Sequence, residues 1–215
     1  MAPPDTKDTI LDAAESLFAE QGFAATSLRQ LTTRAGVNLA AVNYHFGGKE
    51  ELARAVLLRR IQPINDERLR RLDALERPAR LEAVVRAFLE PALQCADEGD
   101  RTCADGHAPA TRLCRVFGRI SIEQPPFIRG FLTEQFRELG RRFVAMLREA
   151  APGIDAETAW WRMHFTIGAM AHTLQNAHLL DEVSDGACTA RDPAAIVEHL
   201  VAFATAGFAA PEVTR

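Results

Sequence analysis

The sequence predicts an all-α fold of about nine helices, and three observations support this prediction. Apolar residues recur at helical spacing, as in the series Ile10, Leu11, Ala14, Leu17 and Phe18. Capping residues, glycines and prolines stand at the ends of most of these segments. No stretch of the sequence alternates polar and apolar residues in the way that a half-buried strand does.

The first half of the chain is predicted to contain four helices. Asp5 or Thr6 can cap the first helix and Gly22 can end it, and Thr26 or Ser27 can cap the second. Asn38 can cap a third helix, which two glycines end. The expected ranges are 6–22, 27–35 and 39–45, then 49 to between 63 and 75.

The rest of the chain is predicted as five further helices. Prolines and polar, glycine-rich stretches mark the breaks between them, and residues 97–108 form the longest expected loop. Asp192 and Pro193 give the last helix a proline at its favoured first position. The expected ranges are 80–95, 109–123, 127–150, 155–180 and 193–209.

The composition is that of a globular protein and excludes several other classes. The 215 residues are 47% hydrophobic and 25% charged, with 13 glycines and 11 prolines, so the chain is neither collagen-like nor disordered. No apolar run approaches the ~18 residues of a membrane span, so we expect no membrane partner. The formal net charge of -4 argues against non-specific coating of nucleic acid but leaves a local positive face open.

The cysteines indicate a reducing compartment. Cys95, Cys103, Cys114 and Cys188 form no CxxC pair, and the N-terminus does not resemble a signal peptide, so we expect a cytoplasmic protein. Cys103 and His107 lie four residues apart, with Cys114 beyond, which leaves a metal or redox site open beside inert thiols. We expect no cofactor and assign no metal ligand.

Residues 26–46 have the pattern of a helix-turn-helix. Two short helices are joined by Ala35-Gly36-Val37-Asn38, and a glycine-containing turn of three or four residues is typical of that motif. We expect Leu39, Val42 and Phe46 to form one buried face of the second of these helices, because their spacing is three and four. The residues left on its outer face are Ala40, Ala41, Asn43, Tyr44 and His45.

These outer residues have the chemistry of DNA recognition. Alanines permit close approach and can touch thymine methyl groups, and Asn43 can pair with N6 and N7 of adenine. Tyr44 and His45 can reach phosphates or base edges. Residues 24–60 carry six cations against two anions, whereas the preceding helix is acidic, so we expect phosphates to meet this cationic segment. The alternative is a plain three-helix bundle whose polar residues are merely exposed.

Three motifs follow one another in the segment that begins at Ile10: the AGV turn, the YHF end and a K-E-x-L. They lie within ILDAAESLFAEQGFAATSLRQLTTRAGVNLAAVNYHFGGKEEL. The segment closely resembles the N-terminal domain of the TetR/AcrR family of bacterial transcriptional regulators. The resemblance implies a homodimer that binds a palindromic double-stranded DNA operator, usually as a repressor, and is released by a small molecule. We therefore expect a helix-turn-helix DNA-binding domain over 1–50 and a ligand-binding and dimerisation domain over 51–215.

The resemblance also assigns DNA contacts by position. Tyr44 and His45 match contacts of the family's recognition helix, and Lys49 matches a lysine that contacts phosphate. Gly48 departs from the serine that is common in the family, at a cost of about a few tenths of a kcal/mol in capping. The residues that we predict for DNA contact are Thr26, Ser27, Arg29, Asn38, Ala40, Asn43, Tyr44, His45 and Lys49.

The family places its dimer interface on the last two helices, and the sequence allows this. Gly168, Ala169 and Ala171 permit close helix approach, so these helices can form half of a four-helix bundle across a two-fold axis. A closed monomer core is the alternative. The apolar surplus of the middle helices implies an effector pocket, with Arg119 or His164 as a carboxylate anchor. The residues that we predict for ligand contact are Phe88, Leu113, Phe117, Arg119, Ile120, Phe131, Trp161, His164 and Phe165.

Most of the chain further resembles a TetR subgroup that senses long-chain fatty acids, which implies a fatty acid, an acyl-CoA or another apolar effector. The alternative function is an all-α carrier of small molecules that does not bind DNA. We expect no enzyme, because the sequence lacks GxSxG, P-loop, HExxH and GxGxxG motifs.

Overall fold

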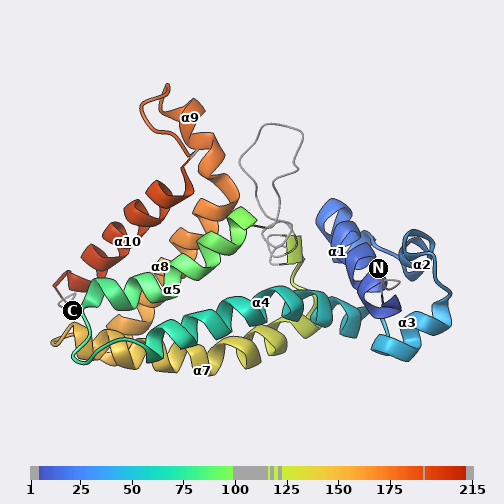
Figure 1. The fold of residues 1–215 in the computed structure, drawn as a ribbon, viewed down its shortest axis with the longest axis horizontal. Helices are drawn as coiled ribbons and strands as arrows, with labels where there is room; N and C mark the ends of the chain where they lie inside the picture. Colours follow the sequence, from blue (N-terminus) through green and yellow to red (C-terminus); the bar gives the residue numbers. More distant parts are fainter. Residues whose placement is uncertain (1–4, 99–115, 117–118, 121–122, 191, 212–215) are drawn as a thin grey trace. The chain divides into compact units, whose positions relative to one another are not determined.

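The structure is a computed structural model, and every element that it describes is helical (Figure 1). It describes residues 5–98, 116, 119–120, 123–190 and 192–211. Within these ranges there are nine α-helices and one short 3₁₀ helix, which confirms the all-α prediction. The predicted loop over 97–108 and the predicted helix over 109–123 lie largely outside the described residues.

The chain packs as two compact units, which we call the N-terminal unit and the C-terminal unit. The former comprises Met1–Pro63 and Arg112–Glu134, and the latter comprises Ile64–Thr111 and Gln135–Arg215. Two long helices, α4 (Lys49–Asp73) and α7 (Pro126–Ala150), each contribute residues to both units. These two units are defined by packing and not by function. The boundary expected at residue 50, between a DNA-binding domain and a ligand-binding and dimerisation domain, therefore stays a prediction.

Three short helices begin the N-terminal unit: α1 (Thr6–Ala25), α2 (Leu28–Ala35) and α3 (Leu39–Phe46). Their N-caps are Asp5, Ser27 and Asn38, all of which the sequence predicts as capping positions. Each cap side chain accepts a hydrogen bond from a backbone N–H of the first turn, which satisfies a donor that the helix cannot.

Gly22 interrupts α1 at the position where the sequence predicts its end. Its φ of +87° is a conformation that glycine adopts without steric cost, and a short second helical stretch follows this kink up to Ala25. Thr26 closes the turn that follows, because its buried hydroxyl donates to the Gly22 carbonyl at 2.7 Å.

Buried apolar side chains from α1 to α4 form the core of the N-terminal unit. They include Ile10, Ala14, Leu17, Phe18, Leu31, Val42, Phe46, Leu52 and Val56. The predicted burial of Leu39 is wrong, since its side chain is 49% exposed. Leu39 is the first residue of α3, and side chains in a helix tilt toward the N-terminus, so this one points past the end of the core.

A buried carboxylate connects α1 to α4. Glu15 is 1% exposed and accepts hydrogen bonds from Nη2 of Arg59 at 2.5 Å and Nη2 of Arg60 at 2.8 Å. The exposed Asp12 accepts from Nη1 of the same Arg59 at 2.8 Å. A charge in a protein interior is costly unless it is paired, so this cluster fixes the first half of α4 against α1.

The C-terminal unit is a layered arrangement of helices. With the later parts of α4 and α7, it contains α5 (Leu81–Glu98), α8 (Ala156–Asn176) and α10 (Pro193–Ala209). The last of these packs against both α5 and α8. A 3₁₀ turn (Ala177–Leu179) and α9 (Leu180–Val183) follow α8, so the helix predicted over 155–180 is divided near its end.

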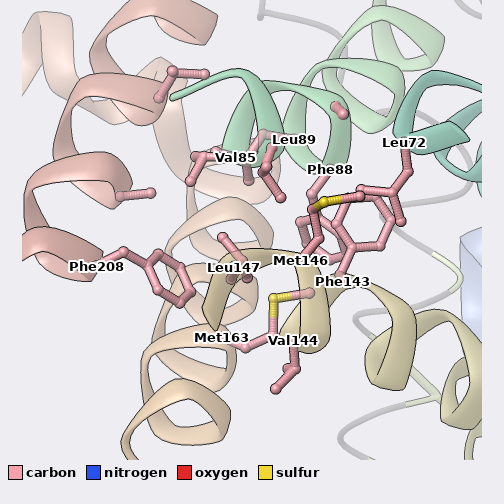
Figure 2. Close-up of a cluster of buried hydrophobic side chains, with 14 of the residues drawn as sticks. Leu72, Val85, Phe88, Leu89, Phe143, Val144, Met146, Leu147, Met163 and Phe208 are labelled. Atoms are coloured by element: carbon pink, nitrogen blue, oxygen red, sulfur yellow. The ribbon is translucent and has the colours of Figure 1, made fainter. Parts of the chain in front are cut away.

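Every one of these long helices contributes to one hydrophobic core (Figure 2). At its centre Phe143 is fully buried and meets Phe88 edge to face, with ring centroids 5.1 Å apart. Such aromatic pairs contribute about 1 kcal/mol beyond their buried area. Val85, Leu147, Met163 and Phe208 are among the other core residues that Figure 2 labels.

None of the helices in the described part of the chain has the length and apolar character that a membrane crossing requires. The same residues contain no group of three or more His, Cys, Asp or Glu side chains arranged for a metal ion. Cys103, His107 and Cys114, the metal or redox alternative, lie outside the described residues. Cys188 is an exposed free thiol.

Replacing Glu15 with Gln should destabilise the protein by about 3 kcal/mol, because Arg60 loses its carboxylate partner and Arg59 is left with the exposed Asp12. Urea denaturation measures this change as a lower midpoint at an unchanged slope. The matched control is Asp12→Asn, which removes an exposed partner of the same arginine and should cost only about 0–1 kcal/mol. Equal destabilisation by the two substitutions would show that the buried carboxylate has no special role.

Candidate nucleic-acid interface

Helix α3 presents one face to the core and the other to solvent. Val42 and Phe46 are 0% and 9% exposed, whereas Ala40 and Asn43 are exposed and Tyr44 is 86% exposed. Gly47 ends the helix at φ +77° and donates its N–H to the Asn43 carbonyl at 2.8 Å. The outer face of α3 therefore carries an amide and a phenol that the protein itself does not cover.

The ring of His45 lies beside that of Tyr44, with centroids 5.1 Å apart and planes nearly perpendicular. His45 is half-buried and also lies near Phe46, at 6.2 Å between ring centroids. Its imidazole consequently sits between the core and the outer face, where one ring nitrogen can reach a phosphate while the ring keeps its packing.

Two of the predicted DNA contacts cap the recognition motif. Asn38 is exposed, and its amide oxygen accepts from the backbone N–H of Ala41 at 2.9 Å. Ser27 is exposed and forms a capping box, in which its hydroxyl accepts from the backbone N–H of Gln30 at 3.2 Å and its own backbone N–H donates to Oε1 of Gln30 at 2.8 Å. Both residues therefore define the geometry of the helices in addition to lying at the surface.

Arg29 and Thr26 lie in opposite environments. Arg29 is exposed in the first turn of α2, where its side chain adds to the positive end of the helix dipole. Thr26 is only 1% exposed, and both donor and acceptor roles of its hydroxyl are used inside the unit, by Gly22 and Gln21. We therefore do not keep Thr26 among the candidate DNA contacts.

Lys49, the first residue of α4, is held against the end of α1. Its Nζ lies 4.3 Å from the centroid of the Phe23 ring and donates to the Ala24 carbonyl at 3.4 Å. Partial burial lowers the pKa of Lys49, and the nearby Glu123 opposes this shift. The ammonium has three donors, so it can hold this position and still bind a phosphate with the others.

Glu123 is a feature of this site that the sequence analysis missed. Its carboxylate accepts the backbone N–H of Ala24 at 2.8 Å, beside Lys49. A Cβ atom at Gly22 would lie only 2.0 Å from Oε1 of Glu123, so the kink of α1 and the carboxylate depend on each other. Phe127 packs nearby, with its ring 5.2 Å from that of Phe23. Ala24 and Glu123 are 99 positions apart in the sequence, so no local pattern predicts their contact.

The expected cationic face is largely neutralised within the unit. Four of the six cations of residues 24–60 pair with carboxylates, and three of them use acidic residues of α1 that were expected to face away. These pairs are Arg34–Glu20, Arg54–Glu51, Arg59–Asp12, Arg59–Glu15 and Arg60–Glu15. For Arg29 and Lys49 the described residues provide no ion pair, so the positive potential concentrates on these two side chains.

The predicted effector residues are divided between the two units. Phe88 is buried in the C-terminal unit, whereas Ile120 and Phe131 are buried in the N-terminal unit. Arg119, one of the two predicted carboxylate anchors, is exposed. Leu113 and Phe117 lie outside the described residues.

The other three predicted effector residues line the solvent-exposed face of α8. Trp161 and Phe165 are 54% and 62% exposed, and His164 is exposed beside them. Their predicted role as effector contacts therefore stays a prediction. The indole of Trp161 stacks on the Phe165 ring at 5.8 Å, so the two form a continuous apolar surface. Helical periodicity cannot separate such a surface from a core face, because both follow the same spacing.

Two family descriptions match this chain. Residues 10–56 match "Bacterial regulatory proteins, tetR family", and residues 86–207 match "Tetracyclin repressor-like, C-terminal domain". The HTH-type transcriptional regulator SrpR of Pseudomonas putida is 42% identical over 60 residues, which are 28% of this chain and 28% of SrpR. The HTH-type transcriptional regulator BetI of Rhizobium meliloti is 24% identical over 155 residues, 72% of this chain and 70% of BetI. Over several of its curated relatives the match spans less than half of their length.

Among solved structures, the fatty acid degradation regulator FadR from Bacillus halodurans has a similar fold, with a TM-score of 0.67 at 15% identity. The alignment covers 96% of this chain and 98% of FadR. The two family matches, the longer of which spans more than half of the residues, agree with the capped helix-turn-helix described above. The chain belongs to the TetR family of bacterial regulatory proteins.

Proposed function

We propose that this chain is a transcriptional regulator that binds a palindromic DNA operator as a homodimer. We further propose that it acts as a repressor and leaves the operator when a small apolar molecule binds to it. The observation that carries the DNA-binding part is α3, whose outer face leaves Asn43 and Tyr44 uncovered while Val42 and Phe46 anchor it. An α-helix of this kind fits the major groove of B-DNA.

The side chains divide into two roles on DNA. Asn43 can read adenine through a bidentate pair, and Ala40 permits close approach to the bases. Arg29, Tyr44 and Lys49 are suited to phosphates, which fix the register of α3 without reading sequence. Ser27 and Asn38 hold the two helices at the ends that would face the backbone.

The proposed dimer interface is the exposed face of α8 with that of α10. The stripe Trp161, Phe165, Gly168 and His172 follows helical spacing and is exposed along its length. Phe203 of α10 is 67% exposed. Soluble monomers rarely expose contiguous apolar patches of this kind, so a second copy of the chain is the occupant that we propose.

Two further observations support a second copy on this face. An open depression of 460 Å³ is lined there by Glu157, Trp160, Trp161 and His164, where a side chain of a partner helix can enter. Arg162 donates to the carbonyls of Phe208 at 2.6 Å and Pro211 at 2.9 Å, which fixes the end of α10 to α8. Dimerisation would place two recognition helices about 34–36 Å apart, one turn of DNA.

The effector is proposed to be a fatty acid, an acyl-CoA or another apolar molecule. The aromatic interior around Phe88 gives an apolar environment, and the sequence resembles regulators that respond to fatty acids. FadR, which shares the fold, is a fatty acid degradation regulator. Release requires that the effector bind the released form more tightly than the DNA-bound form.

We propose that helix α4 transmits the effect of effector binding to the recognition motif, because one continuous helix begins at Lys49 and ends at Asp73. The boundary between the two units falls immediately after Pro63, which is inside this helix. A proline removes one hydrogen bond from a helix interior, so this is the point at which α4 bends at least cost.

Arg29→Ala should weaken operator binding and lower the slope of log affinity against log salt by about 1, because one phosphate contact is lost. Fluorescence anisotropy at several salt concentrations measures both quantities. Arg137→Ala removes an equally exposed arginine from the C-terminal unit and is the matched control. An unchanged slope for Arg29→Ala would remove this side chain from the interface.

Selection of the wild-type protein on randomised duplex DNA should return two inverted half-sites, and this experiment tests the proposed function as a whole. The same selection with Asn43→Ala should return a motif that has lost its preference at one position per half-site, at a cost of about 1–3 kcal/mol. If the wild-type protein enriched no motif, the alternative function as a carrier of small molecules would be favoured. An unchanged motif for the variant would reject base reading by Asn43.

Phe165→Glu should convert the dimer to a monomer, because a carboxylate would be buried without a partner in the proposed interface. Sedimentation velocity at micromolar concentrations measures the change. Leu58→Glu, at a position 37% exposed in the N-terminal unit, is the control that should stay dimeric. A wild-type protein that sediments as a monomer would overturn the proposed interface.

A further inference from the structure

The C-terminal unit contains a buried arginine that the proposed function has not used. Arg68 lies on α4 and is 4% exposed, and Asn65, one turn earlier, is 6% exposed. The guanidinium carbon lies 4.1 Å from the centroid of the Phe88 ring. A cationic side chain is thus enclosed by the aromatic interior that was proposed for the effector.

The hydrogen bonds of Arg68 all go to neutral acceptors. Nε donates to the backbone carbonyl of Phe88 at 2.8 Å, and Nη1 donates to Oδ1 of Asn65 at 3.2 Å. Among the described residues the partner of Nη2 is the sulfur of Met170, at 3.4 Å, and a thioether is a weak acceptor. These contacts occupy three of the five N–H groups of the guanidinium, and the weakest of the three contacts is the one made by Nη2.

The surrounding arginines show how unusual this environment is. More exposed arginines of the same unit each have a carboxylate partner: Arg70 with Glu67, Arg71 with Glu67 and Glu90, Arg86 with Glu82 and Glu198, and Arg142 with Asp73. For Arg68 the described residues supply no carboxylate within ion-pair distance. Burial lowers the pKa of Arg68 to about 9, so the side chain is still a cation at neutral pH.

A buried charge without a counter-ion is costly, and a bound anion removes that cost. Carboxylates match the planar fork of a guanidinium and accept two parallel hydrogen bonds from it. One guanidinium balances the single charge of a carboxylate, whereas a phosphate ester carries nearly two negative charges and would remain partly unbalanced. The aromatic ring and thioether beside Arg68 offer no polar partners for a hydrophilic body.

We propose that Arg68 is the binding site for the carboxylate of an apolar organic acid, held by Nη1 and Nη2 between α4, α5 and α8. The apolar part of this acid would contact Phe88 and Met170. That this acid is the effector rests on the proposed function. Because Arg68 and Lys49 belong to the same helix, an anion at Arg68 acts directly on the element that leads to the recognition motif.

The test compares acids with alcohols of the same chain length. Full-length protein freed of bound lipid is titrated calorimetrically with laurate and palmitate, and with dodecanol and hexadecanol. The wild type should bind each acid at least ~30-fold more tightly than its alcohol, as expected for a buried charge pair. Arg68→Met should lose this difference, because it keeps an apolar side chain of similar length without the charge. Arg68→Lys should keep part of the difference.

The matched control is Arg70→Met, on the same helix but with its side chain 67% exposed and paired to Glu67. It should discriminate acids from alcohols as the wild type does. If Arg68→Met fails to fold, the comparison of Arg68→Lys with the wild type replaces it. Equal binding of acids and alcohols by the wild type, or full discrimination by Arg68→Met, would overturn the site.

Operator binding of the wild-type protein separates this proposal from the proposed function. Addition of laurate or palmitate should release the DNA from the wild type, and dodecanol should not. Protein that discriminates acids but binds no operator would overturn the regulatory function and leave the carboxylate site standing. Protein that binds operator but no acid would overturn the site alone.

Discussion

A helix of eight residues is too short to persist in water without support, and α2 and α3 are both of this length. The N-terminal unit exists in its observed form because Val42 and Phe46 secure α3 to a core that α1 and α4 supply. Caps at Ser27 and Asn38 and the left-handed Gly47 then fix where each short helix begins and ends. These contacts make α3 rigid. Because α3 is already ordered in the free protein, DNA binding through Asn43 would not carry the entropic cost of ordering this helix.

Ion pairs make the surface of the N-terminal unit less positive than a count of its cations indicates. Glu15 and its neighbours on α1 neutralise arginines of α4, so these cations stabilise the fold instead of adding to the surface potential. The charge that remains is concentrated near α2 and the start of α4. Selectivity in such an interface depends on shape and base contacts more than on general attraction to the phosphate backbone.

Much of this molecule could be predicted from local sequence, and the remainder depends on contacts between distant residues. Caps, glycine turns and apolar periodicity predicted the helices, because each of these signals acts within one or two turns. The kink at Gly22 depends on Glu123, and the buried Arg68 depends on α5 and α8, so no local pattern contains them. The strongly apolar α8 shows that periodicity alone does not assign the faces of a helix. Its apolar residues serve both an interior face, as at Met163, and an exposed face, as at Phe165.

The aromatic residues of this chain are distributed so that all of its tryptophan emission comes from one helix. The single tyrosine, Tyr44, lies on α3, and the two tryptophans, Trp160 and Trp161, are adjacent on α8. All three are exposed, at 86%, 44% and 54%. Indole emission excited at the red edge of the indole band, where phenol does not absorb, therefore reports the polarity around α8 alone. Association through α8 can be followed by this emission in the unlabelled protein.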